Sequence, residues 1–220
     1  VLFFTLYVSF FEWKVDRFFT GVKSTDRLSD IKGDLLSLMR KNLIVVNIWM
    51  EKKFKGYEYL SKSKRREMYE NAEKISGKFL LFCETSKIDE SFVRQEIKDN
   101  DLTYPEGGTD KIIFLRNIAE FLKPENLYHY IETSSFGKLL NDPEKEKLEG
   151  DCNQIVTLYI YLFSLRYDIN ELNIKLLPEH VCLHFRNIDI EATNGTFTRY
   201  RESTDVLPVT EIIATNMLDI

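Results

Sequence analysis

The chain has 220 residues, of which 44% are hydrophobic and 30% are charged, and its formal net charge is −5. This composition is that of a folded globular protein, so it excludes wholesale disorder and leaves room for one or two domains. The acidic balance excludes the broadly basic surface by which proteins attract nucleic acid. Three cysteines, Cys83, Cys152 and Cys182, are too few for a disulfide framework and predict reduced thiols.

The first eleven residues are almost wholly apolar, and Glu12 follows them directly. A helix that crosses a bilayer needs about 20 apolar residues, so this segment is too short to span one by itself. Three interpretations compete: a buried helix, which we favour, an interfacial helix, or the last turns of a span that begins upstream. Because no methionine opens the sequence, we expect it to begin inside a longer polypeptide. The expected location is the cytoplasm, and the alternative is membrane association through this segment or an anchor upstream of Val1.

The region 1–108 has the hydrophobic spacing of amphipathic helices, which predicts a helical first half. A turn rich in proline and glycine at 104–108 ends that region. Thr109 or Asp110 is then expected to cap a helix that ends before Pro124. No glycine-rich phosphate loop of a common pattern occurs in the chain, so no nucleotide cofactor is expected.

The pattern changes at Gly150. Cys152 opens a segment whose apolar run at 155–165 has the length of a fully buried helix. Residues 180–185 then alternate between apolar and polar side chains, as a half-buried strand does, and residues 188–191 repeat the alternation. The two residues between these strands predict a tight hairpin turn.

The predicted hairpin brings histidines and carboxylates onto one face of the sheet. With a two-residue turn, His184 lies opposite Asp189, and Cys182 lies opposite Glu191. His180 is then diagonal to Glu191 and within reach of its long side chain. The residues by themselves leave open whether Glu191 or Asp189 completes a site with His180.

A cysteine at the first turn of a helix lies near backbone N–H groups that have no partner in the helix and near the positive end of its dipole. Both features favour the thiolate of Cys152, which is the reactive form. The same N–H groups, including that of Cys152, are suited to binding an oxyanion. Gly150 is expected to let the chain turn sharply and to leave space for a substrate. A histidine base and a carboxylate that orients it would complete this chemistry.

Three blocks of sequence, in this order, resemble the bacterial transglutaminase-like superfamily: GDC at 150–152, PEHVCL at 178–183 and IEATNG at 190–195. The resemblance implies a papain-like α+β core in which Cys152 is the nucleophile, His180 the base and Glu191 the orienting carboxylate. Many members have Asp at the third position. A bacterial subgroup with Glu there is closer to this chain, and it often continues into tetratricopeptide-like helices.

The predicted fold is therefore α+β. It has a helical region at 1–108, a transglutaminase-like core at 109–205 and the start of a helical segment at 206–220. The resemblance implies a cysteine hydrolase or acyltransferase that acts on an amide bond of a protein or peptide through a thioester. The alternative is a non-catalytic transglutaminase-like domain that serves as an interaction or scaffold module. Neither a cofactor nor a metal ion is expected, nor is a nucleic-acid partner.

One further interpretation uses the same residues as metal ligands. His180, Cys182 and His184 alternate on one strand face and, together with Cys152, offer a set of zinc ligands. Their spacing is not that of a zinc knuckle or ribbon, so we rank this interpretation below the catalytic one. Residues 194–196 match a glycosylation acceptor, but the Asn-Gly pair already has a sufficient explanation as a turn.

Overall fold

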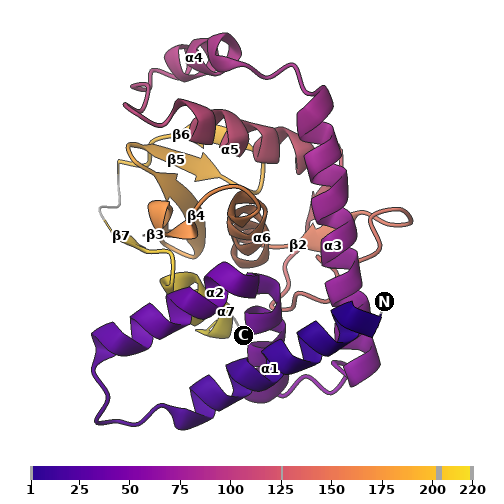
Figure 1. Cartoon of the computed structure of the whole chain (residues 1–220). Coiled ribbons are helices and arrows are strands. Elements are labelled where there is room, and N and C mark those ends of the chain that lie inside the picture. The colour runs from indigo at the N-terminus through magenta and orange to yellow at the C-terminus, as the bar shows by residue number, and fades with distance from the viewer. Residues whose placement is uncertain (1, 125, 202–204, 219–220) are drawn as a thin grey trace.

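The computed structural model describes residues 2–124, 126–201 and 205–218. Helices and their connections make up the first half of the chain, and a sheet follows in the second half (Figure 1). The helices of the first half are α1 (Leu2–Gly21), α2 (Leu28–Met50), α3 (Lys62–Thr85), α4 (Glu90–Asp99) and α5 (Thr109–Phe121). A single π-helical turn at Glu51–Lys55 extends α2. The predicted helical first half and α+β class are thus confirmed.

The second half begins with a small parallel pair of strands, β1 (Tyr128–Tyr130) and β2 (Leu148–Gly150), which leads into α6 (Cys152–Ser164). A five-stranded antiparallel sheet follows, with the strand order β6-β5-β4-β3-β7. Its strands are β3 (Asn173–Leu177), β4 (His180–Phe185), β5 (Ile188–Glu191), β6 (Thr196–Thr198) and β7 (Val206–Pro208). Helix α7 (Glu211–Leu218) ends the described chain.

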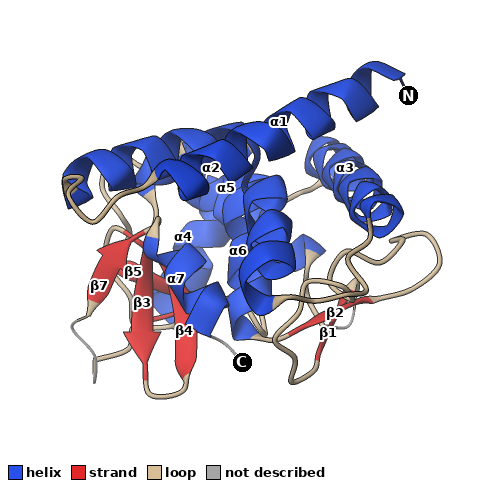
Figure 2. Cartoon of the chain, turned by 90° about the horizontal axis from the view of Figure 1, so that it is seen from below, coloured by secondary structure: helices blue, strands red, loops and turns tan. Residues whose placement is uncertain are grey.

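Helix α6 occupies the centre of the molecule. It contacts β4 on one side and α5, α2 and α7 on others, and it lies between the sheet and the β1–β2 pair (Figure 2). Every residue from Ile155 to Phe163 is buried, which explains why this run is apolar around the whole helix. Full burial of one large apolar side chain contributes about 1.5–3 kcal/mol, so α6 supplies much of the driving force for folding.

The predicted hairpin register is confirmed. His184 pairs with Asp189 and Phe185 pairs with Ile188 in the β4–β5 ladder. The turn requires Arg186 to adopt a φ of 58°, in the left-handed region that side chains other than glycine rarely occupy. The Arg186 guanidinium donates hydrogen bonds to the backbone carbonyls of Glu106 and Gly107, and these contacts hold the turn.

The amino-terminal helix differs from the buried helix that we favoured. Only one face of α1 is buried, through residues such as Phe11 and Val15, and this helix packs against α2. Tyr7, Phe10 and Trp13 on another face are about half exposed. Among the described residues, none of the helices combines the length and the apolar character that crossing a bilayer requires.

The expected cap of α5 is also wrong. The helix begins at Thr109, after Gly108, and no side chain caps it. A Cβ atom at Gly108 would lie 3.0 Å from Nε of Arg186 and 3.1 Å from the ring of Phe185. Close packing against the β4–β5 turn therefore selects a glycine at this helix start, in place of a capping side chain.

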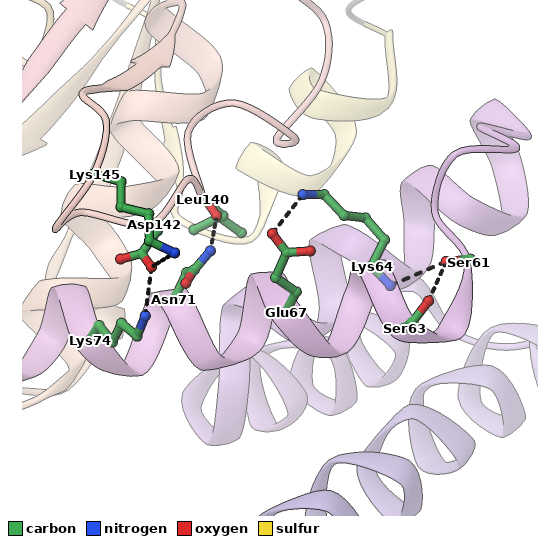
Figure 3. Close-up of polar contacts among 9 residues, drawn as sticks. All are labelled: Ser61, Ser63, Lys64, Glu67, Asn71, Lys74, Leu140, Asp142 and Lys145. Carbon is green, nitrogen blue, oxygen red and sulfur yellow. Dashed lines mark hydrogen bonds and ion pairs between the residues drawn. The ribbon is translucent and has the colours of Figure 1, made fainter.

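Helix α3 anchors the loop that connects β1 to β2 (Figure 3). Strand β2 then leads into α6. The buried Asn71 side chain donates from Nδ2 to the carbonyl of Leu140 at 2.9 Å. Lys74, which follows Asn71 by three residues in α3, forms an ion pair with Asp142 at 2.9 Å. The hydrogen bond from Lys74 and a backbone N–H hold the pKa of the Asp142 carboxyl at about 2. These contacts fix the path of the chain toward Cys152.

We expect Asn71→Ala to lower the free energy of unfolding by about 1–3 kcal/mol, because it leaves the buried carbonyl of Leu140 without its donor. Urea unfolding would measure this change. Lys64→Gln is a matched control, since it breaks an exposed ion pair with Glu67 on the same helix and should cost about 0.5 kcal/mol or less. Equal losses in the two variants would contradict the anchoring role of Asn71.

Candidate active site

Cys152 is the first residue of α6, and a capping box fixes the position of that helix start. The Asp151 carboxylate accepts hydrogen bonds from the N–H groups of Asn153 at 2.9 Å and Gln154 at 3.4 Å. In return, the N–H of Asp151 donates to the Gln154 side-chain oxygen at 3.0 Å. The sequence therefore begins the helix at Cys152 for a local reason, and the thiol has a fixed origin.

The helix start offers fewer free donors than we expected. Asp151 engages the N–H groups of Asn153 and Gln154 with its side chain, and the N–H of Ile155 donates to the Asp151 carbonyl at 3.0 Å. The N–H of Cys152 is the one donor of this first turn that Asp151 does not engage. Any oxyanion bound at the start of α6 would therefore use the backbone N–H of Cys152 itself.

Gly150 has a different role from the sharp turn that we predicted, and that prediction is wrong. It is the last residue of β2, pairs with Tyr130 and does not have a positive φ. A Cβ atom here would lie 3.3 Å from both Cβ of Gln154 and Cδ1 of Leu139. The close approach of the capping box and the preceding loop therefore favours a glycine at this position.

His180 brings the three predicted site residues together. Its Nε2 atom lies 2.6 Å from Oε2 of Glu191, across the β4–β5 pair. The Cys152 side chain interacts with the same imidazole. The interaction with Cys152, followed by the hydrogen bond with Glu191, raises the pKa of His180 to about 10 and outweighs its partial burial. The ring is therefore protonated at neutral pH.

Glu191 is held by more than His180. Its Oε1 atom accepts a hydrogen bond from the Thr193 hydroxyl at 2.6 Å, and its Oε2 atom accepts one from the Tyr200 hydroxyl at 2.7 Å. Burial by itself would raise the pKa of the Glu191 carboxyl, but the hydrogen bonds from His180, Thr193 and Tyr200 outweigh it and lower that pKa. Glu191 therefore remains an anion that orients His180.

The rival carboxylate, Asp189, belongs to a neighbouring polar cluster. Its Oδ1 atom lies 2.6 Å from Nδ1 of His184, and its Oδ2 atom lies 2.9 Å from Nζ of Lys175. The backbone N–H of Tyr200 donates to the same Oδ2 atom at 2.7 Å. Of the two carboxylates that we left open, Glu191 is the one that contacts His180.

The hydroxyl of Tyr200 is a site contact that sequence reasoning missed. Tyr200 follows β6 at one edge of the sheet, and the chain then returns to β7 at the opposite edge. No local pattern around Tyr200 indicates that its side chain meets Glu191, because the contact depends on where this crossover passes. The pairing of β6 with β5 would have been the only usable signal.

The residues of the zinc interpretation lie in different environments. His180 interacts with Cys152 and forms a hydrogen bond with Glu191, whereas His184 forms a hydrogen bond with Asp189. Cys182 is fully buried. In the described part of the chain, no group of three or more His, Cys, Asp or Glu side chains is arranged to hold a metal ion. Comparison of the chain with protein-family models, curated proteins and solved structures found no match.

The raised pKa of His180 makes a prediction about the pH dependence of stability. A group whose pKa rises on folding stabilises the fold fully below its unfolded pKa, near 6.5, and this contribution is lost as the pH rises through about 10. We expect the free energy of unfolding to fall between these pH values and expect His180→Gln to flatten the profile. Urea unfolding at stepped pH measures this, with the exposed His129→Gln as control. An unchanged slope in His180→Gln would contradict a stabilised imidazolium.

A second prediction concerns Tyr200→Phe. Loss of the hydroxyl removes a donor from the buried Glu191 carboxylate, which should raise the pKa of Glu191 and lower that of His180. The free energy of unfolding should fall by about 1.5–3 kcal/mol, as for a hydrogen bond to a charged group. NMR titration of the His180 ring and urea unfolding are the measurements. Tyr57→Phe, which removes a hydroxyl bonded to the neutral Ser134, should leave the His180 titration unchanged.

Proposed function

We propose that this chain carries a transglutaminase-like cysteine site, with Cys152 as nucleophile, His180 as proton carrier and Glu191 as orienting carboxylate. The observation that carries the proposal is the position of the His180 ring, which interacts with Cys152 and forms a hydrogen bond with the buried Glu191 carboxylate. The packing of α6 against β4 supports a papain-like core, because it presents a cysteine at a helix start to a histidine on the adjacent antiparallel sheet.

The proposed reaction cleaves an amide bond of a protein or peptide. The Cys152 thiolate attacks the carbonyl carbon, and the resulting oxyanion accepts a hydrogen bond from the N–H of Cys152. His180, which holds a proton at neutral pH, donates it to the departing amine and leaves a thioester on the sulfur. Water or a second amine then attacks the thioester and gives its proton to His180, which restores the thiolate–imidazolium pair.

The rate at which iodoacetamide alkylates each cysteine tests this proposal. Cys83 and Cys182 serve as internal controls, because burial raises the pKa of both thiols. At pH 6.5 we expect Cys152 to react at least about tenfold faster than Cys83, since only the thiolate is nucleophilic. Mass spectrometry of the digested protein would give the rate at each cysteine.

His180→Ala should reduce alkylation of Cys152 to the rate of Cys83 or below. His184→Ala is the matched control, because it removes a histidine of the same strand whose carboxylate partner is Asp189 and not Glu191. This variant should leave the alkylation rate of Cys152 within about twofold of the parent value. The catalytic proposal fails if Cys152 reacts no faster than Cys83 in the parent protein. It fails equally if the rate is insensitive to His180.

A second proposal is a non-catalytic interaction domain that retains the same fold. One observation favours it: the Cys152 residue is only 9% exposed, although the His180 side chain beside it is 26% exposed. In that case the hydrogen bonds of His180 stabilise the contact between α6 and the sheet without a reaction. This role would be supported if Cys152 is alkylated slowly while His180→Gln still lowers the free energy of unfolding at neutral pH.

A further inference from the structure

A cavity of about 600 Å³ opens on the sheet, and Cys152 is not among the residues that line it. Its charged lining comes from β3, β4, the β4–β5 turn, β5 and the segment that follows β6. Lys175, His184, Arg186, Asp189, Arg199 and Arg201 supply it. None of the three proposed catalytic residues lines this cavity, and His184 is four residues along β4 from His180. At about 3.3 Å per residue, their Cα atoms lie about 13 Å apart.

The cavity concentrates positive charge in an acidic chain. Among the described residues that line it, four are lysine or arginine and Asp189 is the one acidic residue, whereas the net charge of the whole chain is −5. Asp189 is buried and already accepts hydrogen bonds from Lys175, His184 and the N–H of Tyr200. The negative charge of Asp189 is therefore compensated by its own partners in the wall of the cavity. The arginines give the described lining a net positive charge.

The three arginines differ in how they are held. The Arg186 guanidinium donates to two backbone carbonyls, those of Glu106 and Gly107, and lies over the Phe185 ring, so it is fixed in place. Arg199 and Arg201 are exposed, and neither forms an ion pair or side-chain hydrogen bond with another residue of the described ranges. One fixed and two adaptable guanidinium groups thus meet at one opening.

We propose that this cavity binds a phosphate group, carried on a small polar molecule or as free phosphate. Guanidinium groups match the oxygens of phosphate with paired N–H donors, and a surplus of several cations suits a dianion better than a single carboxylate. The Nδ1 atom of His184 is committed to Asp189, which leaves Nε2 as a further donor or acceptor for the ligand. A cavity of this volume accommodates a phosphate monoester, in the size range of small-molecule sites.

Isothermal titration calorimetry of the full chain would test the site with three probes: inorganic phosphate, phenyl phosphate and benzoate. Benzoate has the same phenyl ring as phenyl phosphate, but it carries a planar carboxylate with a single negative charge. We expect phenyl phosphate to bind at least about tenfold more tightly than benzoate. Comparison of phenyl phosphate with inorganic phosphate distinguishes an ester ligand from the free ion. Failure of both phosphates to bind at millimolar concentration, or equal binding of benzoate, would overturn the proposal.

Single variants locate the binding on the cavity. Arg199→Gln and Arg201→Gln should each weaken phenyl phosphate binding about tenfold or more, through loss of charge-assisted hydrogen bonds. Arg27→Gln removes the same charge at an exposed position before α2 and should change affinity less than about twofold. An equal effect of Arg27→Gln would overturn the proposal, because it would indicate unspecific attraction. Cys152→Ala should bind normally, so this site and the proposed catalysis can fail separately.

Discussion

Burial of α6 from Gln154 to Phe163 is the constraint on which the arrangement of side chains depends. The sheet encloses this helix on one side and α5, α2 and α7 enclose it on others, so it cannot shift without opening the apolar core. Cys152 is its first residue, and the Asp151 cap fixes where the helix begins. Because β4 packs directly on α6, His180 is held to the same core. The contacts that stabilise the fold therefore also set the distance between thiol and imidazole.

Two histidine–carboxylate pairs lie side by side on the hairpin, yet their surroundings give them different properties. Asp189 contacts both His184 and the buried Lys175, so it has an ion pair with a lysine in addition to its histidine. Within the described part of the chain, Glu191 contacts His180 and the hydroxyl or N–H donors of Thr193 and Tyr200, which stabilise its charge without a second cation. The protonated His180 is the positive partner of Glu191, and the interaction with Cys152 followed by the hydrogen bond with Glu191 explains why the pKa of that ring is raised.

The features that could be predicted from the sequence are local ones. Alternation of apolar and polar residues and a two-residue turn determine the β4–β5 register, and that register predicts that His180 lies within reach of Glu191. Strand β3 was missed because Lys175 interrupts its apolar pattern. That lysine is buried because the Asp189 carboxylate and the backbone carbonyl of Tyr200 accept hydrogen bonds from its Nζ atom. The contact of Tyr200 and the packing role of Gly150 depend on residues distant in sequence, which periodicity does not report.

Tyr200 connects the two polar regions of the sheet. Its backbone N–H donates to Asp189 in the wall of the cationic cavity, while its hydroxyl donates to Glu191 in the candidate active site. Arg199 and Arg201 are its immediate chain neighbours, so the backbone segment that lines the cavity also carries the hydroxyl that holds Glu191. One short segment therefore contacts both polar regions directly, through the backbone and the side chain of Tyr200.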